Sequence, residues 1–221
     1  MKKTEKNYFM CDFETTVYQG QETTEVWASA VCPFWEEDGM VFTSLPNTFA
    51  YFLSLQKDII AYYHNLKFDG YFWLDFLYRN PVFSPFFPDG RLARKKDMPD
   101  NSFTYLISGK GQWYFIIIKA GGHFIELRDS LKLLPFSVAQ LGQSFGTKHK
   151  KLSMEYEGYR YAGCEITESE KQYILNDCYV VKEALEIMLS EGHDKLTIGA
   201  CCLVEMKNTG VYSDNWDSLF P

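Results

Sequence analysis

Four acidic residues in three separate segments are the side chains of this sequence that could do chemistry together. Asp12 and Glu14 stand in CDFETT, Asp69 in HNLKFDG and Asp177 in YILND, each among apolar or aromatic neighbours. Burying an unpaired carboxylate in such surroundings is costly, so we expect the four to form one site that gathers cations. A pair of divalent metal ions, Mg²⁺ or Mn²⁺, suits this set of hard oxygen ligands.

Asp12 and Glu14 follow the apolar stretch YFMC, two residues apart. Successive side chains of a strand alternate between its two faces, so both carboxylates point to one side and Phe13 to the other. A D-x-E pair alone is common on exposed strands, and only the apolar run before it favours a buried position. An exposed acidic pair therefore stays open as the alternative.

Asp177 interrupts the inward face of a predicted helix that carries Tyr173 one turn earlier. This spacing brings a phenol close enough to the acid to orient an attacking water. A helix N-cap or a surface ion pair would also explain an acid here, but Asp177 lies well inside the helix and has no Lys or Arg four residues later. Tyr173 taken alone could equally be a core residue.

The segment HNLKFDG places Asn65 and Asp69 at a predicted strand-to-helix junction. Asp69 could join the metal site or hold a metal-bound water. Phe68 and Phe72 could stack on unpaired bases, a contact worth roughly 1–3 kcal/mol per base, although most aromatic residues here should belong to the core. We expect His64 to be structural, because the acids already supply hard oxygen ligands.

The patterning of apolar residues predicts the elements that must position these side chains. Strands are expected over residues 8–13, 26–33, 59–63, 112–119 and 123–129, with hairpin turns around Gly20 and Gly121-Gly122. Helices are expected over residues 46–56, 68–80, 136–145 and 167–190, the last opened by the capping box T-E-S-E. This order predicts an α/β fold, a mixed sheet flanked by helices.

Residues 80–101 combine four prolines with a basic cluster, Arg91, Arg94, Lys95 and Lys96. Proline-rich and charged composition predicts an exposed loop. Its basic side chains could contact a phosphate backbone, and a purely solvated loop is the alternative.

The composition limits the class of protein. A chain of 221 residues that is 46% hydrophobic can build one large domain with a full core, followed by a tail. The formal net charge of −7 argues against broad adhesion to duplex DNA but is compatible with a local channel for single strands. The six cysteines lack CxxC spacing, which indicates reduced thiols. No segment has the composition of a signal peptide or membrane span, so we expect a cytoplasmic protein.

The ordered motifs CDFETT, HNLKFDG, DSLKLLPF, KLSM and YILND together resemble the exonuclease domain of protein-primed family B DNA polymerases of phages and linear plasmids. The resemblance runs from about Tyr8 to at least Asp194. It implies a ribonuclease H-like fold of the DEDDy type and removal of nucleotides from the 3′ end by a two-metal mechanism, in a phage- or plasmid-encoded protein of a bacterial host. It assigns residues 1–195 to the 3′–5′ exonuclease domain and residues 196–221 to a C-terminal tail that resembles the lead-in to a polymerase domain.

The resemblance also implies roles for individual residues. The metal-site carboxylates would be Asp12, Glu14, Asp69 and Asp177. Tyr173 would position the attacking water, and Lys151 would steady the region of the scissile phosphate. The positions that hold the 3′ end of single-stranded DNA would be Thr15, Asn65, Phe68, Phe72, Ser130 and Leu131, with Tyr156 helping to arrange the same site.

The sequence departs from those polymerases by having no DTD-like polymerase motif, so we do not expect it to polymerise DNA. Residues 196–221 could be a disordered tail, a new C-terminal element or the result of truncation. Three functions stay open: an exonuclease on single-stranded DNA, alone or beside a polymerase subunit; a non-catalytic module that binds a terminal protein, a polymerase or a host factor; and an RNA exonuclease. The choice between DNA and RNA depends on contacts near Thr15 and Asn65.

Overall fold

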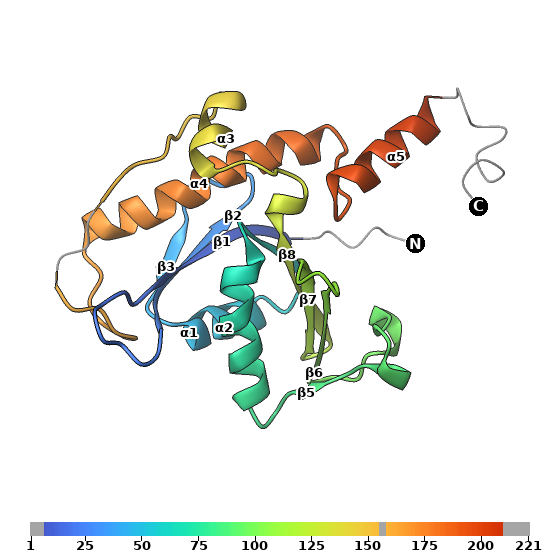
Figure 1. Ribbon diagram of the computed structural model, residues 1–221, viewed down its shortest axis with the longest axis horizontal. Coiled ribbons are helices and arrows are strands. Elements are labelled where there is room, and N and C mark those ends of the chain that lie inside the picture. The colour runs from blue at the N-terminus through green and yellow to red at the C-terminus, as the bar shows by residue number, and fades with distance from the viewer. Residues whose placement is uncertain (1–6, 155–157, 210–221) are drawn as a thin grey trace.

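The computed structural model of the protein describes residues 7–154 and 158–209. Within these residues, an eight-stranded mixed sheet lies at the centre, in the order β3-β2-β1-β4-β8-β7-β6-β5 (Figure 1). The strands are β1 (Asn7–Thr15), β2 (Val26–Pro33), β3 (Met40–Phe42), β4 (Ile59–Tyr63), β5 (Ser84–Pro85), β6 (Ser102–Ile107), β7 (Trp113–Ala120) and β8 (His123–Asp129). The strands β1, β4 and β8 are parallel to one another, and β2 and β7 pair antiparallel on either side of them.

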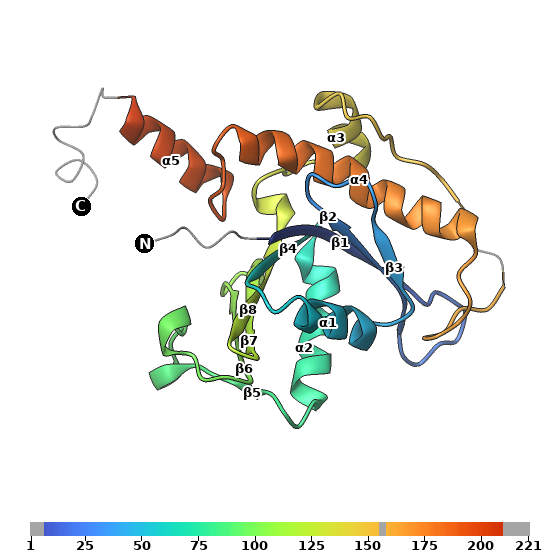
Figure 2. The same cartoon turned by 180° about the vertical axis from the view of Figure 1, so that it is seen from behind.

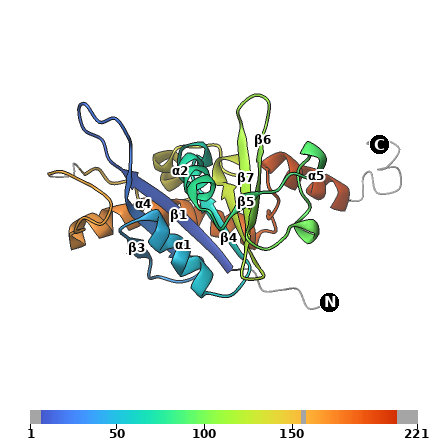
Figure 3. The same cartoon turned by 90° about the horizontal axis from the view of Figure 1, so that it is seen from below.

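Helices cover both faces of the sheet, so the predicted α/β class is confirmed. On one side of β1 lie α1 (Leu45–Ser54) and α2 (Leu66–Arg79), and on the other lie α3 (Val138–Ser144) and α4 (Glu168–Ser190) (Figures 2 and 3). The helix α5 (Ile198–Asn208) follows α4. Three short 3-10 turns complete the described residues, namely η1 (Pro88–Gly90), η2 (Lys95–Asp97) and η3 (Ser130–Lys132).

Alternation along β1 divides its side chains between two cores. Phe9, Cys11 and Phe13 enter the core that also contains α1 and α2. Met10 enters the core beneath α3 and α4. Because the alternation continues to the end of the strand, Asp12 and Glu14 project to the side covered by α4.

Two pieces of local sequence chemistry set element ends as predicted. Thr167 and Glu170 form a reciprocal capping box at the start of α4, in which each side chain accepts a hydrogen bond from the other residue's backbone N–H. Gly121 and Gly122 make the two-residue turn between β7 and β8, with φ values of 58° and 79° that L-residues rarely adopt.

The segment 80–101 is largely exposed, as predicted, but three of its apolar residues are buried. Phe83, Ala93 and Met98 are buried, the last two in a small core with residues of β7. Its basic side chains Arg91, Arg94 and Lys96 are exposed as expected. The apolar residues between the prolines therefore fix this segment to the sheet.

Further elements lie where none was predicted. The strands β3 and β5 are only three and two residues long, too short to leave an apolar pattern. The strand β6 and the helix α5 were also missed, and α5 lies within the segment expected to be a tail. The helix α2 begins at Leu66, two residues before the predicted start.

All six cysteines are free thiols, as their spacing predicted, and only Cys202 is exposed. Among the residues that the structure describes, no helix combines the length and the apolar character needed to cross a bilayer.

Candidate active site

The carboxyl end of β1 brings two acids next to α4. Pairing of β1 with β4 ends at Cys11 and Tyr63, so Asp12 and Glu14 lie just beyond the shared part of the two strands. Burial, together with the negative charges of Glu14 and Asp177, raises the pKa of Asp12 to about 7. Burial makes the largest contribution to this shift, and the repulsion from Glu14 and Asp177 shows that their carboxylates lie close enough to Asp12 to act on it.

Asp69 joins this group from the first turn of α2. Its side chain is buried, at 1% exposure, and burial together with the charge of Asp12 raises the pKa of Asp69 well above its ordinary value. One carboxylate oxygen of Asp69, Oδ1, is buried and has no hydrogen-bond partner among the described residues, and the same is true of Asp177 Oδ1. A buried carboxylate oxygen without a hydrogen-bond partner destabilises the fold unless a ligand binds it.

Lys151 and Tyr173 lie at the same place. The Lys151 ammonium donates a hydrogen bond to Asp177 Oδ2 and lies 5.6 Å from the centre of the Tyr173 ring. Burial alone would lower the pKa of Lys151, but the hydrogen bond and charge of Asp177 raise it. The partner of Asp177 thus comes from the segment before α4 and not from the helix itself, which is why helical spacing could not reveal it.

The donor set fits divalent cations. Within residues 7–154 and 158–209, no three Asp, Glu, His or Cys side chains already converge into a metal cluster. However, Asp12 lies within electrostatic reach of Glu14, Asp69 and Asp177, and both Asp69 and Asp177 keep a buried oxygen without a partner among the described residues. Mg²⁺ and Mn²⁺ prefer this chemistry, so the residues present fit the expected ions.

The residues predicted to contact a nucleic-acid strand differ in how exposed they are. Thr15 and Phe68 line a cavity of about 320 Å³ together with Glu14. Asn65 is exposed and opens α2 in the left-handed conformation, with φ of 79°. Phe72 is only partly exposed, because its ring packs edge-on against Phe13 at 6.3 Å.

Ser130 and His64 form a structural pair instead of an open binding surface. Ser130 is fully buried, and its hydroxyl lies 3.1 Å from the Tyr63 carbonyl oxygen and 2.8 Å from His64 Nδ1. The other ring nitrogen of His64, Nε2, donates to the Phe136 carbonyl at 2.8 Å. His64 is therefore structural, as predicted. Tyr156 lies outside the described residues.

Asp129, at the end of β8, organises the edge of the site and was not singled out from the sequence. Its Oδ1 accepts hydrogen bonds from the backbone N–H groups of Asn65 at 3.2 Å, Leu66 at 3.3 Å and Leu131 at 3.1 Å. One carboxylate thus holds the starts of α2 and η3 against β8. An Asp directly before S-L-K after a strand is a capping signal that could have revealed it.

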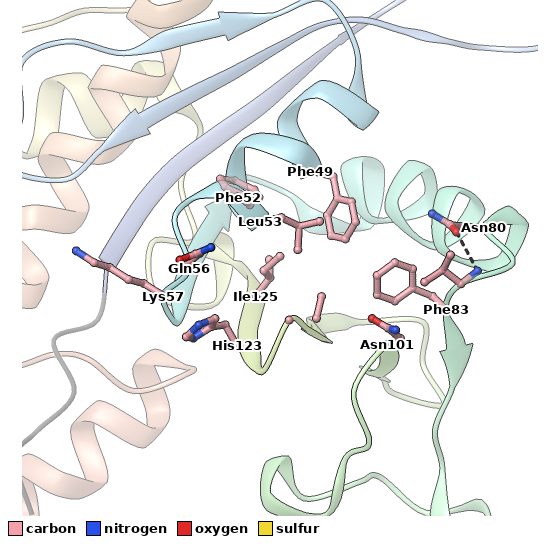
Figure 4. Close-up of a pocket in the computed structure, with 13 residues that line it drawn as sticks. Phe49, Phe52, Leu53, Gln56, Lys57, Asn80, Phe83, Asn101, His123 and Ile125 are labelled. Atoms are coloured by element: carbon pink, nitrogen blue, oxygen red, sulfur yellow. Dashed lines mark hydrogen bonds between the residues drawn. The ribbon is translucent and has the colours of Figure 1, made fainter.

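A second cavity, of about 650 Å³, lies away from the acids (Figure 4). Phe49, Phe52 and Phe83 form its apolar wall, and Lys57 and His123 lie at its edge. None of the predicted site residues lines it.

The chain is similar to viral DNA polymerases in sequence. The family model for DNA polymerase type B, organellar and viral, matches residues 53–198. The DNA polymerase of Bacillus phage phi29 is 33% identical over 228 residues, which cover 100% of this chain and 37% of that protein. The DNA polymerase of Streptococcus phage Cp-1 is 33% identical over 151 residues, covering 62% of this chain and 23% of that protein.

Solved structures agree with the sequence comparison. Phi29 DNA polymerase complexed with single-stranded DNA matches with a TM-score of 0.80 at 31% identity, covering 94% of this chain and 36% of that one. The chain thus spans little more than a third of the length of the phi29 polymerase. Its sheet and flanking helices have the ribonuclease H-like fold of the matching region of that polymerase. The chain belongs to the type B DNA polymerase family of organelles and viruses.

Proposed function

We propose that this chain is a metal-dependent 3′–5′ exonuclease that hydrolyses single-stranded DNA, with residues 1–195 as the catalytic unit. The observation that carries the proposal is the grouping of Asp12, Glu14, Asp69 and Asp177 by three elements far apart in the sequence, with two buried oxygens left free for a ligand. The likeness to a phage polymerase bound to single-stranded DNA supports the substrate class.

The four carboxylates would hold two Mg²⁺ or Mn²⁺ ions. When bound, such ions supply Lewis-acid stabilisation of the developing negative charge and lower the pKa of a water molecule. The reaction adds water to phosphorus and breaks the bond to the 3′ oxygen, so a nucleoside 5′-monophosphate leaves and a new 3′ hydroxyl remains. Each cycle shortens the strand by one nucleotide.

Two neighbouring side chains act on that reaction directly. The Tyr173 hydroxyl, one turn before Asp177 on α4, orients the attacking water by hydrogen bonding. The Lys151 ammonium lies against Asp177 and over the Tyr173 ring, a position from which its positive charge would face a phosphate bound at the acids. It stabilises the charge that develops on the phosphate oxygens in the transition state.

The substrate end is held next to the acids. Thr15 and Phe68 line the same cavity as Glu14, so a 3′-terminal nucleotide placed there would bring its phosphate next to Glu14. The half-exposed ring of Phe68 offers a face for a base that is not paired. Unpaired bases expose that face and duplex bases do not, which favours single-stranded DNA.

The proposal is tested with a 5′-labelled single-stranded oligonucleotide, in Mg²⁺, in Mn²⁺ and in chelator. A ladder that shortens from the 3′ end, needs metal and is lost in the Asp12→Ala, Glu14→Ala double variant would support it. The same sequence as RNA decides the sugar preference, with DNA expected to be cleaved faster. No cleavage of either strand in either metal would refute the proposal and favour a binding module.

A further inference from the structure

Three tyrosine rings gather on the surface at one end of the molecule. Tyr18 lies in the connection between β1 and β2, whereas Tyr159 and Tyr161 lie before α4, and the two segments run side by side (Figures 1 and 2). The rings of Tyr18 and Tyr159 are 5.1 Å apart, and those of Tyr159 and Tyr161 are stacked at 5.9 Å and 29°. The Tyr159 hydroxyl donates to that of Tyr18 at 3.3 Å.

The cluster is not part of a core. The exposed fractions are 43% for Tyr18, 63% for Tyr159 and 51% for Tyr161, so each ring keeps much of its surface in water. Ring-to-ring contacts hold the three in a fixed arrangement while leaving that surface uncovered. A rigid set of exposed aromatic rings is the feature that binds unpaired bases by stacking.

The cluster adjoins the candidate active site. Tyr18 and Tyr159 line the same 320 Å³ cavity as Glu14, Thr15 and Phe68. A strand whose 3′ end lies at the acids therefore has the tyrosine rings within reach of the nucleotides that precede the end. No other cavity lined by Glu14 is found among the best-formed cavities of the described residues.

Arg160, between two of the tyrosines, adds an independent sign of a ligand. Its guanidinium donates to Glu170 and packs 5.2 Å from the Trp27 ring, so its position is fixed. However, Arg160 Nε is buried and has no acceptor among the described residues. Arg160 also lines the cavity, where a phosphate oxygen is the acceptor that such a donor would bind.

We propose that Tyr18, Tyr159 and Tyr161 form a stacking platform for a base that precedes the 3′-terminal nucleotide, and that Arg160 binds the adjoining backbone phosphate. This subsite rests on the proposed exonuclease function, because it takes the same strand. It extends the contact with single-stranded DNA beyond the terminal nucleotide. Binding should therefore depend both on the 3′-terminal base and on the preceding base that stacks on the platform.

The test measures binding separately from cleavage, by fluorescence anisotropy of a labelled twelve-nucleotide strand in chelator. Tyr159→Ala should weaken binding by about tenfold, since one stacking contact corresponds to roughly that factor. Tyr159→Phe keeps the ring and should restore binding to within about twofold. Tyr78→Ala removes another exposed tyrosine, on α2, and is the matched control, and thermal melting checks that every variant is folded.

Abasic substitution locates the subsite. Single abasic positions along the strand should weaken wild-type binding at one position before the 3′ end, and Tyr159→Ala should lose that sensitivity there alone. Arg160→Lys, which lacks Nε, should weaken binding of both normal and abasic strands. Wild-type binding that is unchanged in Tyr159→Ala would overturn the platform and leave the exonuclease standing. Absence of any wild-type binding or cleavage would instead overturn the proposed function beneath it.

Discussion

The pairing of Lys151 with Asp177 puts an ammonium where a carboxylate is proposed to bind a metal ion. The lysine therefore has two effects of opposite sign. In the proposed reaction it would stabilise negative charge on the phosphate, and it would compete electrostatically with the cation for Asp177. The two effects can be separated by measuring the maximal rate and the metal requirement independently.

Lys151→Met is predicted to lower the maximal cleavage rate by about 100-fold while lowering the Mg²⁺ concentration needed for half-maximal rate. Lys96→Met, on the segment that packs beside β7 and β8, is the control and should change neither value. The measurement is a Mg²⁺ titration of cleavage under saturating strand. A variant that needs more Mg²⁺ than the wild type would contradict the proposed competition.

Tyr173→Phe removes only a hydroxyl and should slow cleavage by about 100-fold with strand binding unchanged. The reason is that the ring still packs against Lys151, whereas the group that orients water is gone. Single-turnover kinetics and anisotropy on the same variant check both halves of the statement. Full activity would make Tyr173 a packing residue.

The sequence proposes these residues for the site through their chemical types, their motif spacing and, for Lys151, the resemblance to the family. Their partners were not predictable from it. The ion pair of Lys151 with Asp177 spans a separation of 26 residues, and no local pattern encodes it. Ser130 shows the converse, since its motif agrees with a strand-binding role and its hydroxyl is nevertheless held by Tyr63 and His64.

At the scale of elements, close packing against α2 explains why the helix has a glycine at position 70. A Cβ at Gly70 would lie 2.6 Å from a ring carbon of Trp113, on β7. Gly70→Ala should therefore destabilise the fold by about 2 kcal/mol, although alanine is the better helix former by about 1 kcal/mol. Urea unfolding provides the measurement.

Gly199→Ala in α5 is the matched control, because nothing lies within 4 Å of the added Cβ. It should leave stability unchanged or raise it slightly, by up to about 1 kcal/mol. Stabilisation by Gly70→Ala as well would show that α2 and β7 are farther apart than this structure places them.

Glu126 on β8 ties the segment 80–101 to the sheet through two cations. Its carboxylate accepts from Arg128 Nε at 2.7 Å and from the Lys95 ammonium at 2.5 Å. Burial alone would raise the pKa of Glu126, but the two positive charges and their hydrogen bonds lower it. A lowered pKa stabilises the fold above the ordinary glutamate value, near 4.5, and the stabilisation is lost as the pH falls through the lowered pKa.

Glu126→Gln should therefore cost about 2 kcal/mol at pH 7 and flatten the loss of stability between about pH 5 and pH 3. Asp97→Asn breaks the exposed pair with Arg94 and should change stability by less than about 0.5 kcal/mol. Denaturant unfolding at several pH values checks both. If the pH dependence of the unfolding free energy were unchanged in Glu126→Gln, a group other than Glu126 would be responsible for it.

Long elements with strong local signals were predicted well, and elements defined by tertiary packing were not. The capping box fixed the start of α4, and the apolar runs fixed β2, β4 and β8. The start of α2 was missed because the Asp129 carboxylate, 63 residues away from Leu66, binds its first N–H groups. The helix α5 was missed because little of it is buried, so its sequence lacks an amphipathic pattern.

At the scale of the whole molecule, the sheet brings residues that are far apart in the sequence close together in space. The parallel strands β1, β4 and β8 end at one edge, and α2 and α4 approach that edge from opposite faces. The candidate acids, separated by as much as 165 residues in the sequence, are therefore held by a sheet that has a hydrophobic core on each face. Fold class was predictable from the order of elements, but the strand order that creates this edge depends on long-range pairing.

The most direct measurement is the single-turnover cleavage rate of a 5′-labelled single strand as a function of Mg²⁺, for the wild type, Asp177→Asn and the control Asp75→Asn. The wild-type and Asp75→Asn rates should rise with Mg²⁺ to the same plateau and vanish in chelator. Asp177→Asn should fall at least about 100-fold, because it removes the charge of a metal ligand. Equal rates for the three proteins, or cleavage that persists in chelator, would contradict the assignment of these carboxylates to a metal-dependent nuclease site.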